Sequence, residues 1–506
     1  MKKLKALLKT SGPLAILSKN NQDRVDLFSD LPTGQFIAGR EVPPSSGEYI
    51  DVEDPGSELV FAQCARGNVQ DVEAAVESSK KGFKVWRATP PAERAKMMFK
   101  LADALESHID TLAVIEAMDS GKPLNEAHGD VINSADQLRY YGGLADKFAG
   151  DTVPLGDSFV SFNAKEPVGV TVHVAPWNFP LLTAIRGVAP SLAAGCSAIV
   201  KPSEITPLSS LLMAKIFSEA GLPDGVVNVV NGYGSEIGNA LTSHKDVRHV
   251  TFTGSVATGQ NVMRSAANNI SSVTLELGGK SPAIALSDAD VELVADDMMW
   301  AIFFNSGQVC SAGSRLIIHR DIHEEFMGKF LSNIEKIDFG HALEDKRLAS
   351  ITSKAHLDKI QGMVDAAKER GLTIRCGGSS RVHPLTDKGY YFEPTVIDDV
   401  PMDDDIVQKE IFGPVLAIQI IDSDDDGVDA ANCTDFGLAA CVYSKDTSKA
   451  LAMAGQIDAG QVTINQYYAG GFYTPFGGTK MSGFGREKGL ASIENYLRVK
   501  NITLKI

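Results

Sequence analysis

The sequence of 506 residues contains few cysteines and few tryptophans, six and three respectively. No two cysteines form a CxxC pair, so the paired-thiol spacing of a structural zinc site is missing, and we expect no metal. Such sparse cysteines also argue against a disulfide framework and indicate a reducing compartment, which we take to be the cytoplasm. The six residues are Cys64, Cys196, Cys310, Cys376, Cys433 and Cys441.

Long hydrophobic runs are also absent. No stretch approaches the roughly 18 apolar residues that cross a membrane, so we expect no membrane span. The N-terminal segment 1–16 carries four lysines, but Lys9 and the Gly12-Pro13 pair interrupt its apolar residues, and it has no arginine. We interpret this segment as a solvated arm or a short amphipathic helix, with a mitochondrial targeting peptide as the alternative.

Positive charge is in deficit, with 48 Lys and Arg against 64 Asp and Glu and a net charge of −16. This balance repels phosphate backbones, so we expect no nucleic-acid partner. Acidic runs at 403–405 and 424–426 are interpreted as solvated loops rather than a metal site. A hydrophobic fraction of 44% and a charged fraction of 22% are typical of globular proteins. A chain of this length predicts two or three domains, because a single core stops growing at roughly 250–300 residues.

Between residues 168 and 277, short apolar runs alternate with helix-like stretches. Runs of this kind are typical of buried parallel strands. Thr206 and Pro207 predict the start of one helix, as N-cap and first helical residue, and Gly221 predicts its end. The alternation predicts a doubly wound, Rossmann-like α/β sheet. The predicted strands are Val170–Val174, Ala198–Lys201, Val226–Val230, His249–Thr253 and Val273–Leu277.

A second α/β region is predicted from about Ser281 to Phe476, with a strand at Arg315–His319 and a helix at Ile322–Ile334. Phe159–Ala164 resembles a hairpin arm, and Tyr496–Ile506 alternates like a C-terminal edge strand. Exposed edges usually find a partner strand, which favours oligomerisation. We therefore divide the chain into one α/β domain at 1–147 and 168–279, a second at 280–480, and an oligomerisation arm at 148–167 and 488–506.

Two glycine-containing segments could bind phosphate. Gly232–Gly238 is one residue too long for a GxGxxG fingerprint. Gly254–Gly259 has the glycine spacing of a P-loop but continues with Gln260-Asn261 instead of Lys and Ser or Thr, which disfavours nucleotide hydrolysis. It follows a predicted strand and opens a helix, so its N–H groups could hold a pyrophosphate. An ordinary strand–helix turn is the alternative.

Two residues could carry chemistry. Cys310 lies in a polar, glycine-containing stretch before a predicted strand, although most lone cysteines are inert small hydrophobes. Glu276 ends an apolar strand, where burial would raise its pKa toward that of a general base. An ion pair between Glu276 and Lys280 is the alternative.

Seven motifs follow one another in a fixed order along the chain. They are Pro176–Pro180, Lys201–Glu204, Phe252–Ser255, Glu276–Lys280, Gly307–Cys310, Glu410–Pro414 and Pro475–Gly478. Together they closely resemble the NAD(P)-dependent aldehyde dehydrogenase superfamily. The resemblance extends over essentially the whole chain after about Phe36. It is specific for the superfamily and much less so for the substrate.

This resemblance implies an NAD-dependent oxidation of an aldehyde to a carboxylic acid. Cys310 would attack the aldehyde as a thiolate, and a thioester would form on Cys310 when hydride leaves. The amide of Asn178 and the backbone N–H of Cys310 would stabilise the oxyanion. Glu276 would activate the water that releases the acid. Acyl transfer to coenzyme A or phosphate is one alternative, which the presence of Glu276 disfavours, and a non-catalytic binding protein on the same fold is another.

The resemblance also implies the cofactor contacts. Lys201 and Glu204 would hold the adenosine ribose, and the carboxylate would repel the 2′-phosphate of NADP, so we expect NAD. Ser255 would meet the pyrophosphate, and Glu410 and Phe412 the nicotinamide riboside. The implied cofactor-binding set is Trp177, Lys201, Glu204, Gly254, Ser255, Gly259, Glu410 and Phe412. Dimers or tetramers are expected from the family.

One departure from the family concerns substrate and proton transfer. Many members carry a lysine nine positions after the motif asparagine, where this chain has Gly187, so a proton relay through that lysine does not transfer. Arg186 resembles an arginine that grips a distal substrate carboxylate; alternatively, it pairs with a carboxylate of the enzyme. We expect an acidic or aromatic aldehyde. The tunnel is expected to involve Tyr467, Tyr468, Phe472 and Tyr473, and the predicted substrate-binding set is Phe179, Arg186, Val309, Ser311, Tyr468 and Phe476.

Overall fold

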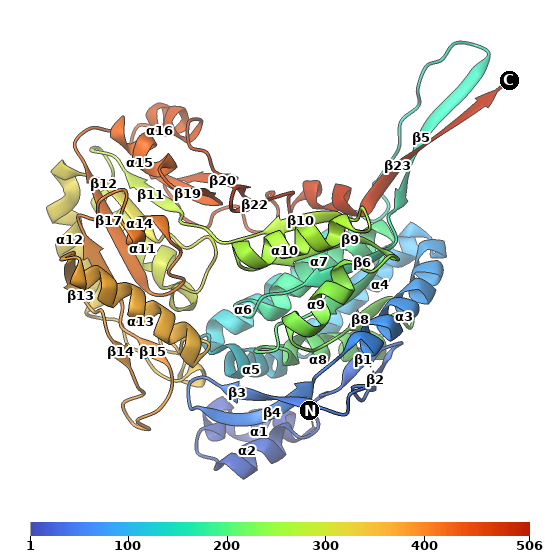
Figure 1. Cartoon of the computed structure of the whole chain (residues 1–506), viewed down its shortest axis with the longest axis horizontal. Helices are drawn as coiled ribbons and strands as arrows, with labels where there is room; N and C mark the ends of the chain where they lie inside the picture. The colour runs from blue at the N-terminus through green and yellow to red at the C-terminus, as the bar shows by residue number, and fades with distance from the viewer. Residues whose placement is uncertain (1) are drawn as a thin grey trace.

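The computed structural model describes residues 2–506 and contains two large open sheets (Figure 1). The first has eight strands in the order β2-β1-β8-β7-β6-β9-β10-β22. Its five central strands, β8, β7, β6, β9 and β10, are parallel, which confirms the predicted doubly wound sheet. The antiparallel strands that flank them were not predicted. The bounds are β1 Gln35–Ile37, β2 Arg40–Val42, β6 Val170–Val174, β7 Ser197–Lys201, β8 Val227–Val229, β9 Val247–Thr253, β10 Ser272–Glu276 and β22 Gly483–Phe484.

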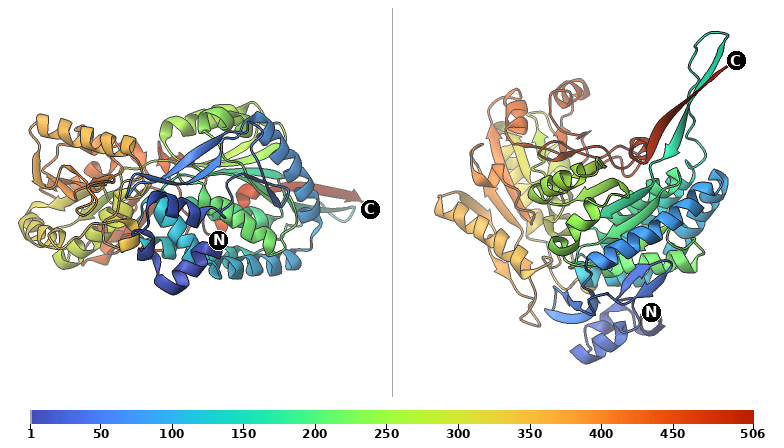
Figure 2. Two further views of the ribbon diagram at one scale, coloured as in Figure 1. Left: turned by 90° about the horizontal axis from the view of Figure 1, so that it is seen from below. Right: turned by 45° about the vertical axis from the view of Figure 1, so that its right-hand side comes forward.

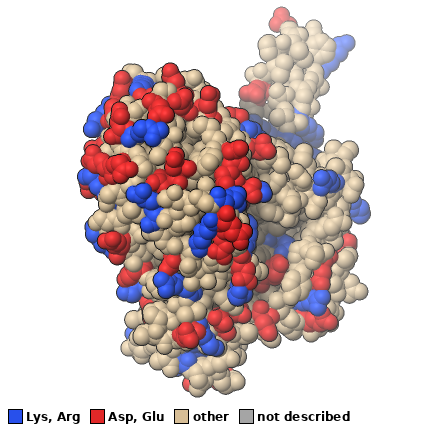
Figure 3. All heavy atoms as spheres, turned by 60° about the vertical axis from the view of Figure 1, so that its left-hand side comes forward, with Lys and Arg blue, Asp and Glu red and all other residues tan. Residues whose placement is uncertain are grey.

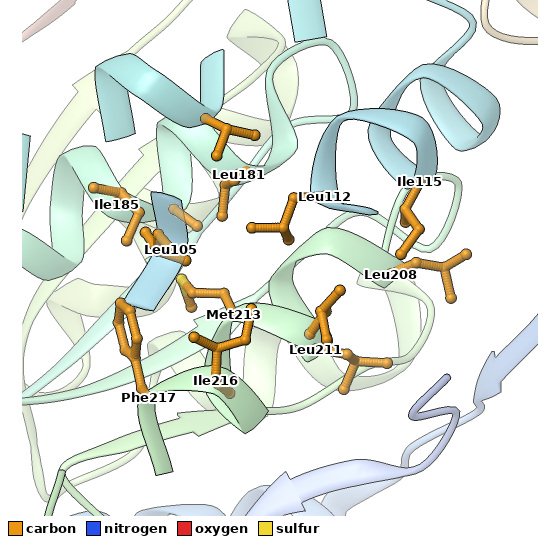
Figure 4. Close-up of a cluster of buried hydrophobic side chains, with 14 of the residues drawn as sticks. Leu105, Leu112, Ile115, Leu181, Ile185, Leu208, Leu211, Met213, Ile216 and Phe217 are labelled. Atoms are coloured by element: carbon orange, nitrogen blue, oxygen red, sulfur yellow. The ribbon is translucent and has the colours of Figure 1, made fainter. Parts of the chain in front are cut away.

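Helices cover both faces of this sheet because its strands are apolar on both sides. Along β7, Ile199 faces one hydrophobic cluster, while Ala198 and Val200 face the other. The first cluster is covered by α3 (Val69–Ala88), α9 (Gly234–Thr242) and α10 (Val256–Ala267). The second is covered by α7 (Pro180–Ala194) and α8 (Leu208–Glu219), with α4 (Pro91–Glu106), α5 (Ile109–Ser120) and α6 (Leu124–Gly142) packed outside them (Figure 4).

The predicted helix between Thr206 and Gly221 is confirmed as α8. Its start differs from the prediction, because Pro207 occupies the N-cap position and the helix begins at Leu208. Leu211, Ile216 and Phe217 of α8 are almost completely buried and point into the cluster that Figure 4 shows. The helix therefore contributes the apolar face that its sequence spacing predicts.

The second sheet has seven strands in the order β13-β16-β17-β12-β11-β19-β20, parallel except for β13. On β17, Leu416 and Ile418 face α11 and α12, whereas Val415 and Ala417 face α13, as a two-residue repeat requires. The predicted strand at Arg315–His319 and its following helix are confirmed as β12 and α12. The strands are β11 Pro282–Ala285, β12 Arg315–His319, β13 Thr373–Cys376, β16 Thr395–Asp398, β17 Val415–Ile421, β19 Ala439–Tyr443 and β20 Gln461–Ile464; the helices are α11 Val291–Phe303, α12 Arg320–Ile334, α13 Lys354–Glu369, α15 Asp426–Asn432 and α16 Thr447–Ala454.

Two segments far apart in the sequence form a projecting arm (Figures 1 and 2). Strand β5 (Phe159–Pro167) pairs with β23 (Leu497–Lys505) in antiparallel register over nine residues. The predicted hairpin arm and edge strand are therefore partners of each other. Several apolar side chains on this ribbon are exposed, namely Phe159, Val160, Phe162, Val499, Ile502 and Leu504. The domain limits at 147, 167, 279 and 480 stay a prediction.

The N-terminal segment forms the helix α1 (Lys2–Ser11), in which Leu4 is fully buried while the lysines are exposed. This confirms the amphipathic interpretation. No helix in the described part of the chain is long and apolar enough to cross a membrane. The remaining elements are α2 Asn21–Phe28, α14 Asp405–Gln408, β3 Tyr49–Asp54, β4 Leu59–Ala65, β14 Ser380–Arg381, β15 Tyr391–Phe392, β18 Phe436–Gly437 and β21 Thr479–Lys480, with short 3₁₀ turns at Pro13–Ile16, Phe304–Gly307, Ala342–Glu344 and Leu490–Tyr496.

The acidic runs lie at the surface where α14 and α15 begin, and three of their carboxylates have cationic partners. Asp404 receives two hydrogen bonds from Arg370 and also caps α14. Asp424 forms an ion pair with Lys449. On the face drawn in Figure 3, acidic and basic side chains are interspersed in the same way. These contacts agree with the loop interpretation of the acidic runs.

Candidate active site

Cys310 lies in the loop between α11 and β12, where it borders two cavities. The loop begins with a tight turn in which Asn305 and Ser306 have φ angles of 47° and 53°. Gly307 follows with a φ of 73°, and a Cβ there would lie 2.2 Å from the carbonyl oxygen of Gly413. Only glycine fits such a close approach, so the Gly-x-x-Cys spacing is what positions the thiol.

Asn178, between β6 and α7, reaches across to the same loop. Its Nδ2 donates a hydrogen bond of 2.8 Å to the carbonyl of Gln308, and Asn305 Nδ2 donates one of 3.0 Å to the carbonyl of Asn178. The amide of Asn178 lines the same cavity as Cys310 and has a second N–H left to donate. This is the position that stabilisation of an oxyanion on a Cys310 adduct requires.

Glu276 ends β10 and is 2% exposed at the wall of the cavity that contains Cys310. Among residues 2–506, neither of its carboxylate oxygens has a hydrogen-bond partner. Burial, reinforced by the nearby Glu487 carboxylate, raises its pKa well above the usual range. The alternative ion pair with Lys280 does not form: the Lys280 amine is buried without a partner, and burial lowers its pKa to about 7.

The first cavity, of about 210 Å³, lies on the side of Cys310 that faces Glu410. Glu410 accepts a hydrogen bond of 3.0 Å from the backbone N–H of Gly279. A Cβ on Gly278 would come within 2.3 Å of Glu410 Oε2, and one on Gly279 within 2.6 Å of the Cys310 carbonyl. Because Gly278 and Gly279 have no side chains, the carboxylate of Glu410 and the Cys310 loop can approach the end of β10.

Three rings form another wall of this cavity, and one of them was missed from the sequence. Phe412, with a φ of 64°, packs against Trp177 at 5.3 Å between ring centres. His356 packs against both rings, and its Nε2–H donates a hydrogen bond of 2.7 Å to the Phe412 carbonyl. Burial lowers the pKa of His356 to about 4, so the ring is neutral. The surrounding sequence of His356 carries no motif that could have identified it.

A larger cavity of about 720 Å³ adjoins the first and shares Trp177 and Ser255 with it. Lys201 and Glu204 line it, 3.4 Å apart, together with Gly254 and the first turn of α10. Unpaired N–H groups at a helix N-terminus favour phosphate, and a carboxylate can accept hydrogen bonds from ribose hydroxyls. The Gly232–Gly238 segment, weak as a motif, contributes Gly234, Ser235 and Gly238 to the same cavity. These residues fit a dinucleotide.

Gly259 was predicted to touch the cofactor, and the structure corrects this. It lies within α10 against the side chain of Leu277, where a Cβ would come within 2.5 Å of Leu277 Cδ2. Its role is close packing of the helix on β10. The other seven predicted cofactor residues line one or both of these cavities: Trp177, Lys201, Glu204, Gly254, Ser255, Glu410 and Phe412.

A third cavity, of about 280 Å³, lies on the other side of Cys310. All six predicted substrate-binding residues line it, namely Phe179, Arg186, Val309, Ser311, Tyr468 and Phe476. Tyr467 does not: it is buried behind the wall and donates a hydrogen bond to the Ser311 carbonyl. Phe472 and Tyr473 pack instead against Tyr140.

The guanidinium of Arg186 already has partners within the protein. It forms an ion pair with Glu487 and donates a hydrogen bond of 3.2 Å to Thr253 Oγ1. Of the two readings of Arg186, pairing with an enzyme carboxylate is therefore the one that the geometry supports. At the neighbouring Gly187, a Cβ would lie 2.3 Å from His173 Nδ1, so no longer side chain fits where relatives carry a lysine.

Comparisons with known proteins identify the family. The sequence model of the aldehyde dehydrogenase family matches residues 42–502. The chain belongs to this family. An aldehyde dehydrogenase from Emericella nidulans is 39% identical over 480 residues, covering 94% of this chain and 96% of the relative.

Solved structures agree with this assignment. Betaine aldehyde dehydrogenase from Staphylococcus aureus in complex with NAD⁺ is 37% identical, with a TM-score of 0.92 over 95% of this chain and 96% of that one. An aldehyde dehydrogenase from Bacillus cereus is 38% identical, with a TM-score of 0.92 over 96% of this chain and 98% of that one. The resemblance read from the seven motifs and the two-sheet α/β fold are confirmed.

The pKa of Cys310 provides a test of the site as described. Burial raises it to about 11, although the nearby Arg186 guanidinium opposes this. The cofactor-free enzyme should hold Cys310 as a thiol at neutral pH. Its alkylation by iodoacetamide should keep rising with pH beyond the roughly 8.5 of an ordinary thiol. Peptide mass spectrometry isolates the rate at Cys310 from the other cysteines, and a plateau at or below about pH 8.5 would contradict the burial argument.

Proposed function

We propose that this enzyme oxidises an aldehyde to the carboxylic acid with NAD, through a thioester on Cys310 that Glu276 helps to hydrolyse. The observation that carries the proposal is the place of Cys310 between two cavities. One contains Glu410, Phe412 and Glu276, and the other is lined largely by aromatic and apolar side chains. A thiol in this position can meet an aldehyde from one side and a nicotinamide from the other.

The chain's own groups account for the remaining steps. NAD, when bound, accepts the hydride that leaves the substrate carbon. The Cys310 thiolate forms the C–S bond, and the Asn178 amide donates a hydrogen bond to the resulting oxyanion. The raised pKa of Glu276 makes its carboxylate a stronger base than an exposed one, suited to removing a proton from water. Water then attacks the thioester, the C–S bond breaks, and Cys310 leaves as thiolate.

Two carboxylates support the choice of NAD over NADP and of water over coenzyme A. Glu204, beside Lys201 in the large cavity, would accept hydrogen bonds from ribose hydroxyls and repel the extra phosphate of NADP. Glu276 favours hydrolysis over acyl transfer to coenzyme A, because an unpaired buried carboxylate next to the thiol is the group that water activation needs. The reduced cysteines support a cytoplasmic location.

Loss of the thiol tests the proposed function directly. Cys310→Ala should lower aldehyde-dependent NADH formation by about a thousandfold or more, because no other group can form the covalent adduct. NAD binding, followed by fluorescence, should be kept, since the cofactor contacts are untouched. Cys376→Ala, in β13 of the second sheet, is the matched control and should keep its turnover. More than about 1% residual activity in Cys310→Ala would contradict Cys310 as nucleophile.

We also propose that the arm formed by β5 and β23 joins copies of the chain into a dimer or tetramer. Its exposed apolar side chains support this. Ile502→Glu with Leu504→Glu should shift the mass measured by light scattering toward the monomer, because charges would then face the partner's apolar strands. Leu451→Glu, on exposed α16, is the control. A monomeric wild type, or an unchanged mass in the double variant, would contradict the proposal.

A further inference from the structure

Lys488 is a cation in the cavity proposed for the aldehyde, at a position that no sequence motif pointed to. It lines the same cavity as Cys310. Its Nζ lies 4.7 Å from the centre of the Phe476 ring, a cation–π distance. Lys488 is thus placed among residues that would surround a bound substrate.

The backbone around Lys488 holds it there under strain. The preceding residue, Glu487, exchanges two backbone hydrogen bonds of 2.7 Å with Phe476, which fixes this segment to the cavity wall. Lys488 itself has a φ of 59°, in the left-handed region that residues with a side chain seldom adopt. Strain of this kind persists only where surrounding contacts impose it, and it is concentrated at functional sites.

The other charges around the cavity are already balanced. Glu487 pairs with Arg186. Asp130, also in the cavity wall, pairs with Lys122, whose other neighbour Glu116 has its pKa raised to about 7 by burial.

Lys488 itself has no ion-pair partner in the described part of the chain. Among residues 2–506, no carboxylate lies within 4 Å of its ammonium. Burial raises the pKa of the Cys310 thiol to about 11, so this group adds no negative charge at neutral pH, and burial also raises the pKa of Glu276, which lines the other cavity. Lys488 keeps most of its charge at neutral pH, since burial lowers its pKa only to about 8. Of the two cations that line the cavity in the described part of the chain, Lys488 is therefore the one without an ion-pair partner.

We infer that Lys488 selects aldehydes that carry a carboxylate and rejects those that carry a cation. This inference rests on the proposed function and names the substrate class of that site. The cavity walls are largely apolar, so an ammonium without a counter-ion there gains from an anionic substrate group and opposes a cationic one. The grip on a carboxylate that sequence reasoning gave to Arg186 thus falls to Lys488, because Arg186 is held by Glu487.

The test compares kcat/KM for aldehydes that differ only in charge. Succinic semialdehyde and para-formylbenzoate are each paired with their neutral methyl ester, and betaine aldehyde supplies a cation. In the wild type, each carboxylate should exceed its ester by about tenfold or more, the scale of a charge-assisted contact. Lys488→Met should lower the ratio of carboxylate to ester by at least about tenfold. Lys488→Glu should make the enzyme prefer the cationic betaine aldehyde to the carboxylates.

Two controls separate charge selection from damage to the fold. In Lys488→Met, kcat/KM for the neutral esters should fall by much less than kcat/KM for the carboxylates, because the esters lack the charge that Lys488 would contact. Lys445→Met removes the same charge from an exposed site and should leave every ratio unchanged. In the wild type, the preference for carboxylates should decline as pH rises through about 8, where Lys488 loses its proton.

Three outcomes would overturn the inference while aldehyde oxidation itself stands. The first is an equal ratio of carboxylate to ester in wild type and Lys488→Met. The second is an equal loss of kcat/KM for acidic and neutral aldehydes in Lys488→Met. The third is a wild-type preference for the cationic aldehyde. Failure of the wild type to reduce NAD with every aldehyde would instead contradict the proposed function, and with it the inference that depends on it.

Discussion

The hydrogen bond from the Asn178 amide to the Gln308 carbonyl, 2.8 Å long, is the contact on which the site depends. It connects the loop after β6 in the first sheet to the Cys310 loop of the second region. Glu410 makes a reciprocal contact by accepting the Gly279 N–H next to β10. Because buried backbone groups must be paired, these bonds hold Cys310 at the seam where the cavities meet. Both regions contribute to the chemistry, and neither contains the site alone.

Burial is the second constraint, and it acts differently on each group. It raises the pKa of both Glu276 and Cys310, because burial disfavours the charged form of each group. It lowers the pKa of His356, which stays neutral and can donate its N–H to the Phe412 carbonyl. The ion pair between Arg186 and Glu487 offsets the cost of burying those two charges. Among the described residues, Lys488 is the cation in the wall of the largely apolar cavity that has no ion-pair partner.

Sequence reasoning located the central strands well, for physical reasons. The five central parallel strands are rich in buried β-branched and apolar residues because helices cover both faces of the sheet. Strands β1 and β22, of three and two residues, were missed because so short a run carries no periodicity. The pairing of β5 with β23 joins segments more than 300 residues apart and could not be read locally.

Errors at the site came from contacts that only the folded chain makes. Gly259 shares the glycine spacing of a phosphate loop, yet it serves to pack α10 against Leu277. Tyr467 and Tyr468 are neighbours, but only Tyr468 faces the cavity. The two readings of Arg186 were equally open until Glu487, 301 positions later, was found beside it. Lys488 went unnoticed because a single lysine in a loop has no distinguishing pattern.

In the proposed mechanism, water that Glu276 activates releases the acid from a thioester on Cys310. The most direct measurement is the mass of the Glu276→Gln enzyme after incubation with NAD and an aldehyde. We expect one acyl group per chain, mapped to the Cys310 peptide, together with about one equivalent of NADH and slow further turnover. NADH formation at the wild-type rate, or an acyl group on a residue other than Cys310, would contradict it.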